Sequence, residues 1–370
     1  MILSLDIKVQ HVVRDELIKA VEKFSAKGGN AMVMDMETGE ILSMVSLPDY
    51  DPNLPNQSPP QASFNRNTLA VNEPGSTFKI LTTTIALETG HDTLNSVYDA
   101  SFPLRVGRFT ITDFKGKNRP LSVQEAFLYS SNIATAKMAL NFGSALQRKF
   151  LKKFGMFEAP KIELSEIGSP LLPKLWQTAT TITVSYGYGI SVSPLQLILG
   201  IGAIINDGRR LQATLRRRDT PLDNESDRIV SAKTSKQMRH LMRLAVTDGT
   251  VKAANVEGYG VIGKTGTAHL IKGRGYATSA KRTAFIGGFP SYDGKIPRYI
   301  VIVMLDDPQA LKETSGYSTA GWNAAPTAGN IISRIAPILC VKPVDNENDS
   351  QFSDDIVAIK HVDTDFSTID

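Results

Sequence analysis

The stretch that organises the chain is Glu73-Pro74-Gly75-Ser76-Thr77-Phe78-Lys79. The turn pair Pro74-Gly75 delivers a serine to the start of a run, Thr77 to Glu88, that favours a helix. Residues three apart on a helix share one face, with Cβ atoms roughly 5–6 Å apart, so Lys79 lies beside Ser76. A helix N-terminus favours negative charge, and burial can hold a lysine neutral. Ser76 is therefore a candidate nucleophile and Lys79 its proton acceptor, although S-x-x-K alone occurs by chance in many chains.

Composition is that of a globular protein with a sizeable core, in one large domain or two ordinary ones. The 370 residues are 42% hydrophobic and 21% charged. The net charge is +4, but residues 343–370 hold eight acids and one lysine, which leaves the body at +11. A basic body could suit an anionic partner such as nucleic acid. The densest basic cluster, residues 209–218, has no interleaved aromatics, so it predicts a surface loop and no nucleic-acid binding.

Cysteine, histidine and hydropathy patterns exclude several classes of protein. The single cysteine, Cys340, permits no internal disulfide and is expected to be a buried thiol in an apolar helix. The five histidines are far apart and match no metal spacing, so neither metal nor cofactor is expected. No run reaches the roughly 18 apolar residues of a membrane span. Met1 opens without the basic and apolar regions of an export signal.

Hydrophobic periodicity predicts an α+β fold. Residues 7–26 have a helical period with a stop at Gly28-Gly29, and residues 325–339 form a closing helix. Strands are expected at 31–35, 41–46, 259–269, 282–289 and 298–305, and helices fill most of the middle. The economical arrangement is one antiparallel sheet with the first and last helices on one face and an all-helical lobe on the other. We expect a domain at 1–342 and a flexible acidic tail at 343–370.

Two further motifs offer chemistry. Ser130-Ser131-Asn132 places a hydroxyl and a carboxamide in a break between helices, although such residues are also ordinary at helix breaks. Lys264-Thr265-Gly266-Thr267 lies in a strand and offers one charge and two hydroxyls to a carboxylate. Gly266 lets something approach the backbone closely. An edge strand with a protective lysine would look the same.

Together these motifs form the S-x-x-K, S-x-N and K-T-G signature of serine β-lactamases and penicillin-binding proteins. From about Ser4 to Pro343 the chain resembles the class B penicillin-binding proteins, and among them the division-specific (septal) peptidoglycan D,D-transpeptidase. Other matching stretches are 45–53, 186–189, 193–196 and 307–309. The resemblance implies the penicillin-binding/serine β-lactamase-like fold, an antiparallel sheet flanked by helices plus a helical lobe.

The resemblance also implies an acyl-transfer mechanism without metal or cofactor. Ser76 would attack the penultimate D-alanine carbonyl of a peptidoglycan stem peptide, and Lys79 would take its proton. Ser130 would pass a proton to the leaving amine. Asn132 would hold the lysine and the substrate. An amine of a second stem would then accept the acyl group and form the cross-link.

Substrate recognition follows from the same resemblance. Lys264, Thr265, Gly266 and Thr267 would hold the terminal carboxylate of the D-Ala-D-Ala stem. The backbone N–H groups of Ser76 and Thr267 would form the oxyanion hole, and β-lactams would acylate Ser76 as dead-end mimics. Class B proteins also carry a membrane anchor and a pedestal domain, which are not in this sequence. The expected place is thus the periplasmic face of the inner membrane, with division-machinery membrane proteins as partners through the missing parts.

Rival functions remain. A serine β-lactamase needs a base for deacylation, and Glu163 and Glu166 are available, but we interpret them as loop acids. A D,D-carboxypeptidase would release D-alanine to water without cross-linking. A penicillin-sensing module would stop at the acyl-enzyme, but no signalling domain is attached. A non-catalytic structural partner of the division machinery would not need all three motifs intact.

Overall fold

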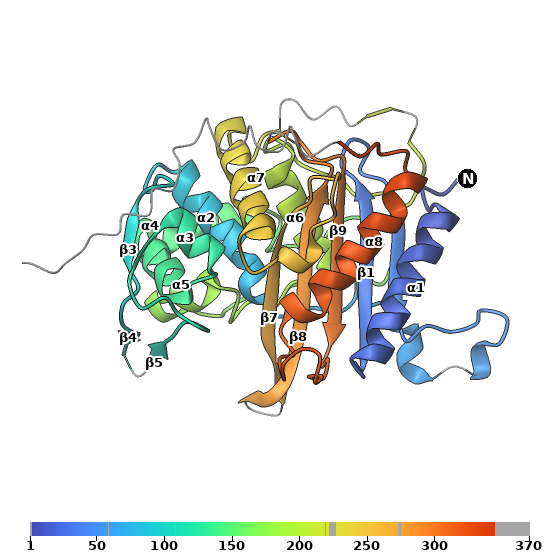
Figure 1. Cartoon of the computed structure of the whole chain (residues 1–370), viewed down its shortest axis with the longest axis horizontal. Helices are drawn as coiled ribbons and strands as arrows, with labels where there is room; N and C mark the ends of the chain where they lie inside the picture. The colour runs from blue at the N-terminus through green and yellow to red at the C-terminus, as the bar shows by residue number, and fades with distance from the viewer. Residues whose placement is uncertain are drawn as a thin grey trace, which may run out of the picture.

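The computed structural model describes residues 2–57, 59–107, 109–218, 220–221, 227–272, 275–292 and 294–344. From residue 345 on, the predicted acidic tail lies outside these residues. A five-stranded antiparallel sheet with the order β2-β1-β9-β8-β7 runs through the centre (Figure 1). Its strands are β1 (Gly28–Asp35), β2 (Ile41–Leu47), β7 (Ile262–Lys272), β8 (Gly275–Phe289) and β9 (Tyr299–Asp306). The prediction of one sheet from the first hairpin and three late strands is confirmed.

Two terminal helices cover one face of the sheet, as the sequence predicts. They are α1 (Ile7–Lys23) and α8 (Ala324–Ile338), which pack against each other in front of the strands (Figure 1). Asp6 caps α1 by accepting hydrogen bonds from two first-turn amides. The helix ends three residues before the expected position because Ser25 adopts a positive φ of 46°. Gly28-Gly29, expected to stop the helix, begins strand β1 instead.

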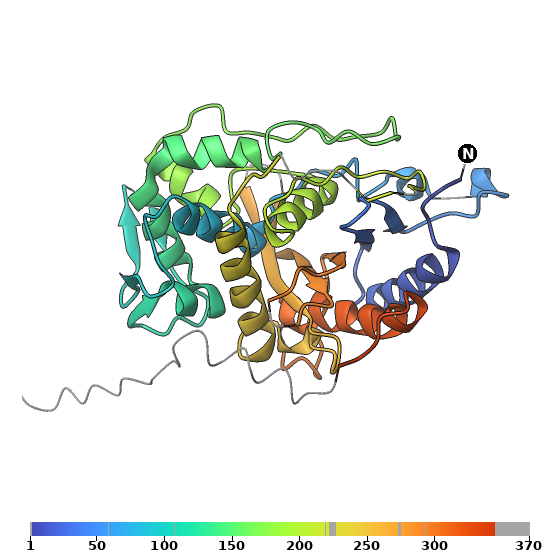
Figure 2. The same cartoon turned by 90° about the horizontal axis from the view of Figure 1, so that it is seen from above.

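The opposite face of the sheet carries the helical lobe, which extends away from the sheet beside β7 (Figures 1 and 2). Its helices are α2 (Lys79–Glu88), α3 (Val123–Leu128), α4 (Asn132–Lys153), α5 (Thr178–Ser185), α6 (Pro194–Ile205) and α7 (Ala232–Thr247). Helix α7 packs on β7, and α2 packs on α4. The three sequence motifs therefore lie where the helical lobe packs against the sheet.

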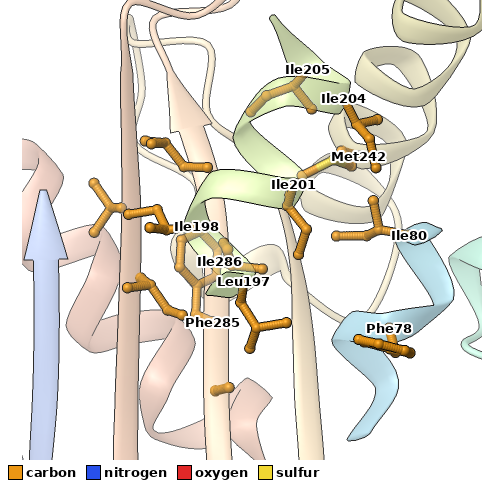
Figure 3. Packing of buried hydrophobic residues seen from close by; sticks show 14 of the residues in the cluster. Phe78, Ile80, Leu197, Ile198, Ile201, Ile204, Ile205, Met242, Phe285 and Ile286 are labelled. Atoms are coloured by element: carbon orange, nitrogen blue, oxygen red, sulfur yellow. The ribbon is translucent and has the colours of Figure 1, made fainter. Parts of the chain in front are cut away.

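Helix α6 fills the space between the sheet and the lobe. Figure 3 shows its isoleucines, among them Ile198 and Ile201, between Phe285 of β8 and Ile80 of α2. All four side chains are fully buried, and each such burial contributes about 1.5–3 kcal/mol. The apolar run of this helix predicts a core helix, and the structure confirms it. This packing holds α2, the helix that follows the turn bearing Ser76, at a fixed distance from the sheet.

Other parts of the chain differ from expectation. Residues 97–122 form two small sheets, in which β3 (Val97–Asp99) pairs with β6 (Pro120–Ser122) and β4 (Leu104–Val106) pairs with β5 (Phe109–Ile111). Cys340 is exposed, because α8 ends before it and the cysteine takes a positive φ of 57°. Within the described ranges, no helix combines the length and the apolarity needed to cross a membrane.

Candidate active site

The candidate nucleophile Ser76 lies in a tight turn and not in a regular α-helix. The turn is the 3-10 segment η3 (Gly75–Phe78), and α2 begins at Lys79 directly after it. Ser76 is half-buried, whereas Lys79 is almost completely buried. Since a 3-10 turn has about three residues per turn, the side chains of residues i and i+3 eclipse each other. The predicted proximity of Ser76 and Lys79 on one face is therefore supported by this local geometry.

Close backbone contacts hold this turn from two sides. The Gly75 amide donates to the Gly187 carbonyl at 3.1 Å. A Cβ on Gly187 would come within 2.0 Å of the Gly75 oxygen, and a Cβ on Gly266 within 2.9 Å of the Pro74 oxygen. Real Cβ atoms do not tolerate such distances, so glycine is required at both positions. The close approach expected at Gly266 is thus made by the chain's own nucleophile turn.

Ser130 lies at the centre of the site, between two lysines. Lys79 Nζ donates to the Ser130 carbonyl at 2.5 Å and lies 3.1 Å from its Oγ, while Lys264 Nζ lies 3.0 Å from the same Oγ. Ser130 has a positive φ of 57°, a conformation that costs a non-glycine residue about 1 kcal/mol or more. This backbone turns both oxygens of Ser130 toward the lysines. The structure therefore brings together three predicted residues from three separate elements.

Burial sets the electrostatics of the two lysines. Desolvation lowers the pKa of Lys264 to about 7. Desolvation also lowers the pKa of Lys79 well below its usual value, the positive charge of Lys264 lowers it further, and the carboxylate of Asp113 opposes the shift. A lysine with a lowered pKa can be neutral at physiological pH and can accept a proton. The site therefore contains a base of the kind that serine activation needs.

The carboxamide of Asn132 donates to a neighbouring backbone carbonyl. Its Nδ2 donates to the Thr112 carbonyl at 2.9 Å, and its backbone N–H donates to Asp113 at 2.5 Å. Asn132 is the first residue of α4, and Ser131 caps the helix by accepting from the Ala134 amide. The expected contact between Asn132 and Lys79 is not part of this arrangement, in which the amide donor is bound to Thr112.

Strand β7 forms the sheet side of the site. It is an edge strand of the sheet, as the sequence predicts, but Lys264 is completely buried and does not protect an exposed edge. Thr265 is nearly buried and Thr267 is half-buried. The Thr267 hydroxyl accepts from the Ala320 amide at 3.2 Å. Thr267 is thereby joined to the loop that precedes α8.

Two features of the site escaped the sequence analysis. Asp113 accepts hydrogen bonds from the Ser131 hydroxyl and the first amides of α4. Phe114, the next residue, meets Tyr317 edge-to-face with ring centroids 6.5 Å apart. The two rings come from the helical lobe and from the β9–α8 loop, so their contact joins the lobe to the loop beside the sheet. No sequence spacing connects these residues to the three motifs, and only the fold brings them together.

Glu163, the candidate deacylating base of a β-lactamase, lies near the edge of the sheet opposite β7. It accepts from the Thr214 hydroxyl at 2.5 Å and the Leu215 amide at 2.9 Å. Thr214 pairs with Glu40, directly before β2, at the sheet edge opposite β7. Desolvation raises the pKa of Glu163, but these two hydrogen bonds outweigh it, so the pKa lies below its usual value. Glu166 is bonded to its neighbour Ser165. Both acids hydrogen-bond to loop residues, in agreement with their interpretation as loop acids.

The geometry defines a class of site: two buried lysines with a serine hydroxyl between them, beside the turn that bears the candidate nucleophile Ser76. No group of three or more potential metal ligands occurs among the residues that the structure describes. The chain belongs to the family of penicillin-binding protein transpeptidase domains, whose model matches residues 29–333. The predicted family and fold class are therefore confirmed.

Individual relatives agree with this assignment. The chain is 38% identical to a probable peptidoglycan D,D-transpeptidase FtsI of Caulobacter vibrioides, over 92% of this chain and 59% of the relative. It is 35% identical to a probable peptidoglycan D,D-transpeptidase PenA of Neisseria flavescens, over 93% of this chain and 84% of the relative. The TP domain of penicillin-binding protein 3 from Burkholderia pseudomallei superposes with a TM-score of 0.81 at 33% identity, covering 92% of this chain and 97% of that domain.

Proposed function

We propose that this chain is the catalytic part of a peptidoglycan D,D-transpeptidase that cross-links stem peptides at the division septum. The observation that carries the proposal is the convergence of two buried lysines with lowered pKa values on the hydroxyl of Ser130, beside the turn that bears Ser76. A serine nucleophile is activated by an adjacent base, and a neutral lysine can be that base. Two buried lysines with no carboxylate partner are costly in an ordinary protein core. The names of the relatives above support the same activity.

In the acylation half-reaction, Ser76 Oγ attacks the carbonyl of the penultimate D-alanine. Lys79 takes the hydroxyl proton. Because Lys79 is already hydrogen-bonded to Ser130, a proton can pass along this contact to the leaving amine of the terminal D-alanine. The backbone N–H groups of Ser76 and Thr267 stabilise the developing oxyanion, at about 3–4 kcal/mol for each donor. The C–N bond breaks, D-alanine leaves, and the acyl group stays on Ser76.

In the second half-reaction, an amine of a neighbouring stem attacks the acyl-enzyme. The proton moves in the opposite direction, so that Ser76 regains its hydrogen and the new amide forms the cross-link. Lys264, Thr265, Gly266 and Thr267 bind the donor's terminal carboxylate, with Lys264 as the positive charge. Asn132 contributes by fixing the break between α3 and α4. β-Lactams acylate the same serine.

The chain covers only part of some relatives, so its setting belongs to the proposal. We place the transpeptidase domain at residues 1–342 and treat 343–370 as an acidic extension. The enzyme acts at the periplasmic face of the inner membrane, with stem peptides as substrates. Division-machinery membrane proteins are its partners. The division assignment rests on the FtsI relative from Caulobacter and a second FtsI from Escherichia coli, at 31% identity.

Covalent labelling tests the nucleophile. Ser76→Ala should abolish labelling by a fluorescent penicillin, while Ser333→Ala, an exposed serine on α8, should label as wild type does. Labelling of Ser76→Ala at the wild-type level would refute the assigned nucleophile. Rapid multiple turnover of penicillin by the wild type would instead identify a β-lactamase. D-alanine release that never yields cross-linked product, even with an added acceptor amine, would identify a carboxypeptidase.

A further inference from the structure

The carboxylate of Asp113 occupies a special position at the start of helix α4. Its Oδ2 accepts the Ser131 hydroxyl at 2.7 Å, and its Oδ1 accepts the amides of Asn132 at 2.5 Å and Ile133 at 3.0 Å. One carboxylate thus satisfies three donors at the N-terminus of a 22-residue helix. A negative charge there is stabilised by the helix dipole. The contact joins the β5–β6 connection to the turn that holds Ser130.

This contact constrains the residue that the two lysines share. Ser130 precedes Ser131 directly and has the positive φ that a non-glycine residue adopts only when its surroundings enforce it. The neighbouring Thr112 carbonyl adds a fourth hydrogen bond, from Asn132 Nδ2. These bonds fix the backbone on the C-terminal side of Ser130. If they loosen, Ser130 can relax to a negative φ and turn its oxygens away from Lys79.

Asp113 also acts on the lysine pair through its charge. The groups that influence the pKa of Lys79 include Lys264, which lowers it, and Asp113, which raises it. Lys115 and Lys117 follow Asp113 in the same loop, and their ammonium groups lie over the rings of Tyr317 and Tyr129. Glu73, before the nucleophile turn, accepts from the Gly189 amide at 2.6 Å. Asp113 therefore combines a positioning contact with an electrostatic effect on the base.

We propose that Asp113 is a positioning residue of the transpeptidase site, which fixes Ser130 between Lys79 and Lys264 and places a negative charge where it acts on Lys79. The inference rests on the proposed function. Asp113 touches no reacting atom in this role; it acts through the Ser130-Ser131-Asn132 turn and through space.

The test is the pH profile of acylation by a reporter penicillin, measured as a second-order rate constant. Asp113→Asn keeps an oxygen acceptor but removes the charge, so Lys79 loses a proton more readily. The acidic limb of the profile should move to lower pH by on the order of half a unit. The maximal rate should fall about tenfold or more as the turn loosens. Asp99→Asn, which neutralises an exposed aspartate of the same lobe, should leave both quantities unchanged.

Two more variants separate charge from geometry. Ser131→Ala removes a donor without removing charge, so the rate should fall while the acidic limb stays in place. Asp113→Glu keeps the negative charge but lengthens the side chain by one methylene. The acidic limb of its pH profile should therefore lie close to that of the wild type, while its maximal rate stays reduced. Thermal unfolding of each variant checks that it folds. If Asp113→Asn does not fold, Asp113→Glu and Ser131→Ala test the positioning role through their maximal rates.

The outcomes are distinct. A profile of Asp113→Asn that superimposes on wild type would overturn the proposal, as would an Asp113→Glu limb displaced as far as that of Asp113→Asn. If the wild type is not acylated at all, the proposed function fails instead.

Discussion

Two clusters of basic side chains lie on the same sheet. In each, two basic groups share one oxygen-bearing partner, but only one of the clusters can supply a base. In one, Lys79 and Lys264 share the hydroxyl of Ser130. In the other, Arg66 Nε and Arg282 Nε share the carboxylate of Asp306, at 3.1 and 2.5 Å. Arg282 pairs across the strands with Ala268, four residues from Lys264, so both clusters lie on one face of the sheet.

The difference lies in which groups can give up a proton. Arginine stays charged under all physiological conditions, and its pairing with Asp306 compensates that charge. The lysines share a neutral hydroxyl. Burial lowers the pKa of both, and the charge of Lys264 lowers the pKa of Lys79 further. The arginine cluster therefore fastens the segment before Ser76 to β9, and the lysine cluster supplies a base. Buried ionisable groups with strongly lowered pKa values mark the functional cluster.

Replacing the base should have the largest effect on chemistry. Lys79→Met keeps the length of the side chain but removes the amine, so we expect acylation by a fluorescent penicillin to fall by about 10³-fold or more. Stability should stay equal or rise by about 1 kcal/mol, because an uncompensated buried amine is lost. Stopped-flow labelling and urea denaturation measure the two quantities. Lys152→Met, on the exposed end of α4, should change neither.

Breaking the arginine cluster should lower stability and leave acylation nearly unchanged. Asp306→Ala leaves two largely buried guanidinium groups without their shared partner, and we expect a loss of about 3 kcal/mol in the free energy of unfolding. Below its melting transition the variant should still be acylated within a few-fold of wild type. Asp49→Ala, which breaks the exposed pair with Arg14, should cost less than about 1 kcal/mol. Equal losses in the two variants would contradict the comparison.

The lysine cluster should also appear in the pH dependence of stability. The pKa of Lys264 is about 7 in the fold, against a usual value of 10.5. Between these values the unfolded chain binds a proton that the folded chain does not. Stability therefore rises with pH, by up to about 1.4 kcal/mol per unit from this group, and the dependence disappears below pH 7. Lys264→Met should remove this rise. Parallel curves for the two proteins from pH 7 to 9 would show that the lysine pKa is not lowered.

A smaller effect is expected where β7 touches the nucleophile turn. Gly266→Ala adds a Cβ only 2.9 Å from the Pro74 oxygen, so the turn must shift. We expect acylation to fall about tenfold, since small displacements of a nucleophile are costly. Gly90→Ala is the matched control: its Cβ would enter open space, although its positive φ of 72° costs about 1 kcal/mol. Acylation by that control should match wild type despite its lower stability.

The smallest effect is expected at Glu163. Because its carboxylate is bound to Thr214 and Leu215 at the far edge of the sheet, Glu163→Gln should change the lifetime of the penicilloyl-enzyme less than about twofold. The lifetime is followed by the decay of label after a chase with excess unlabelled penicillin. A lifetime lengthened many-fold would instead make this acid a deacylating base.

The sequence predicts the sheet and its two covering helices well because those elements have strong local signals. The apolar, β-rich run of β2 and the helical period of α1 are visible within a few residues. Element ends were less predictable: the positive φ of 46° at Ser25 ends α1 early, and the non-helical backbone of Gly143, with a φ of 79°, interrupts α4. Such turns depend on how the flanking elements pack.

The three motifs identify Ser76, Ser130 and Lys264, because reactive side chains at fixed spacing leave a local pattern. Their catalytic roles remain predictions, which the variants above test. Asp113 could not be predicted in the same way, since it acts on residues 18–20 positions away through contacts that exist only in the fold. The orientation of the Asn132 amide toward Thr112 is likewise decided by tertiary packing.

The glycine contacts around the nucleophile turn have a consequence for mutational tolerance. Gly187 and Gly266 approach the turn through backbone atoms, so almost any side chain at either position collides with it. The position of Ser76 therefore depends on the lack of a side chain at Gly187 and Gly266. Substitutions that alter which acyl donors the site accepts are then expected at side chains near it, such as the Phe114–Tyr317 ring pair. A saturation-mutagenesis screen for labelling should find the glycines intolerant and the two aromatics permissive.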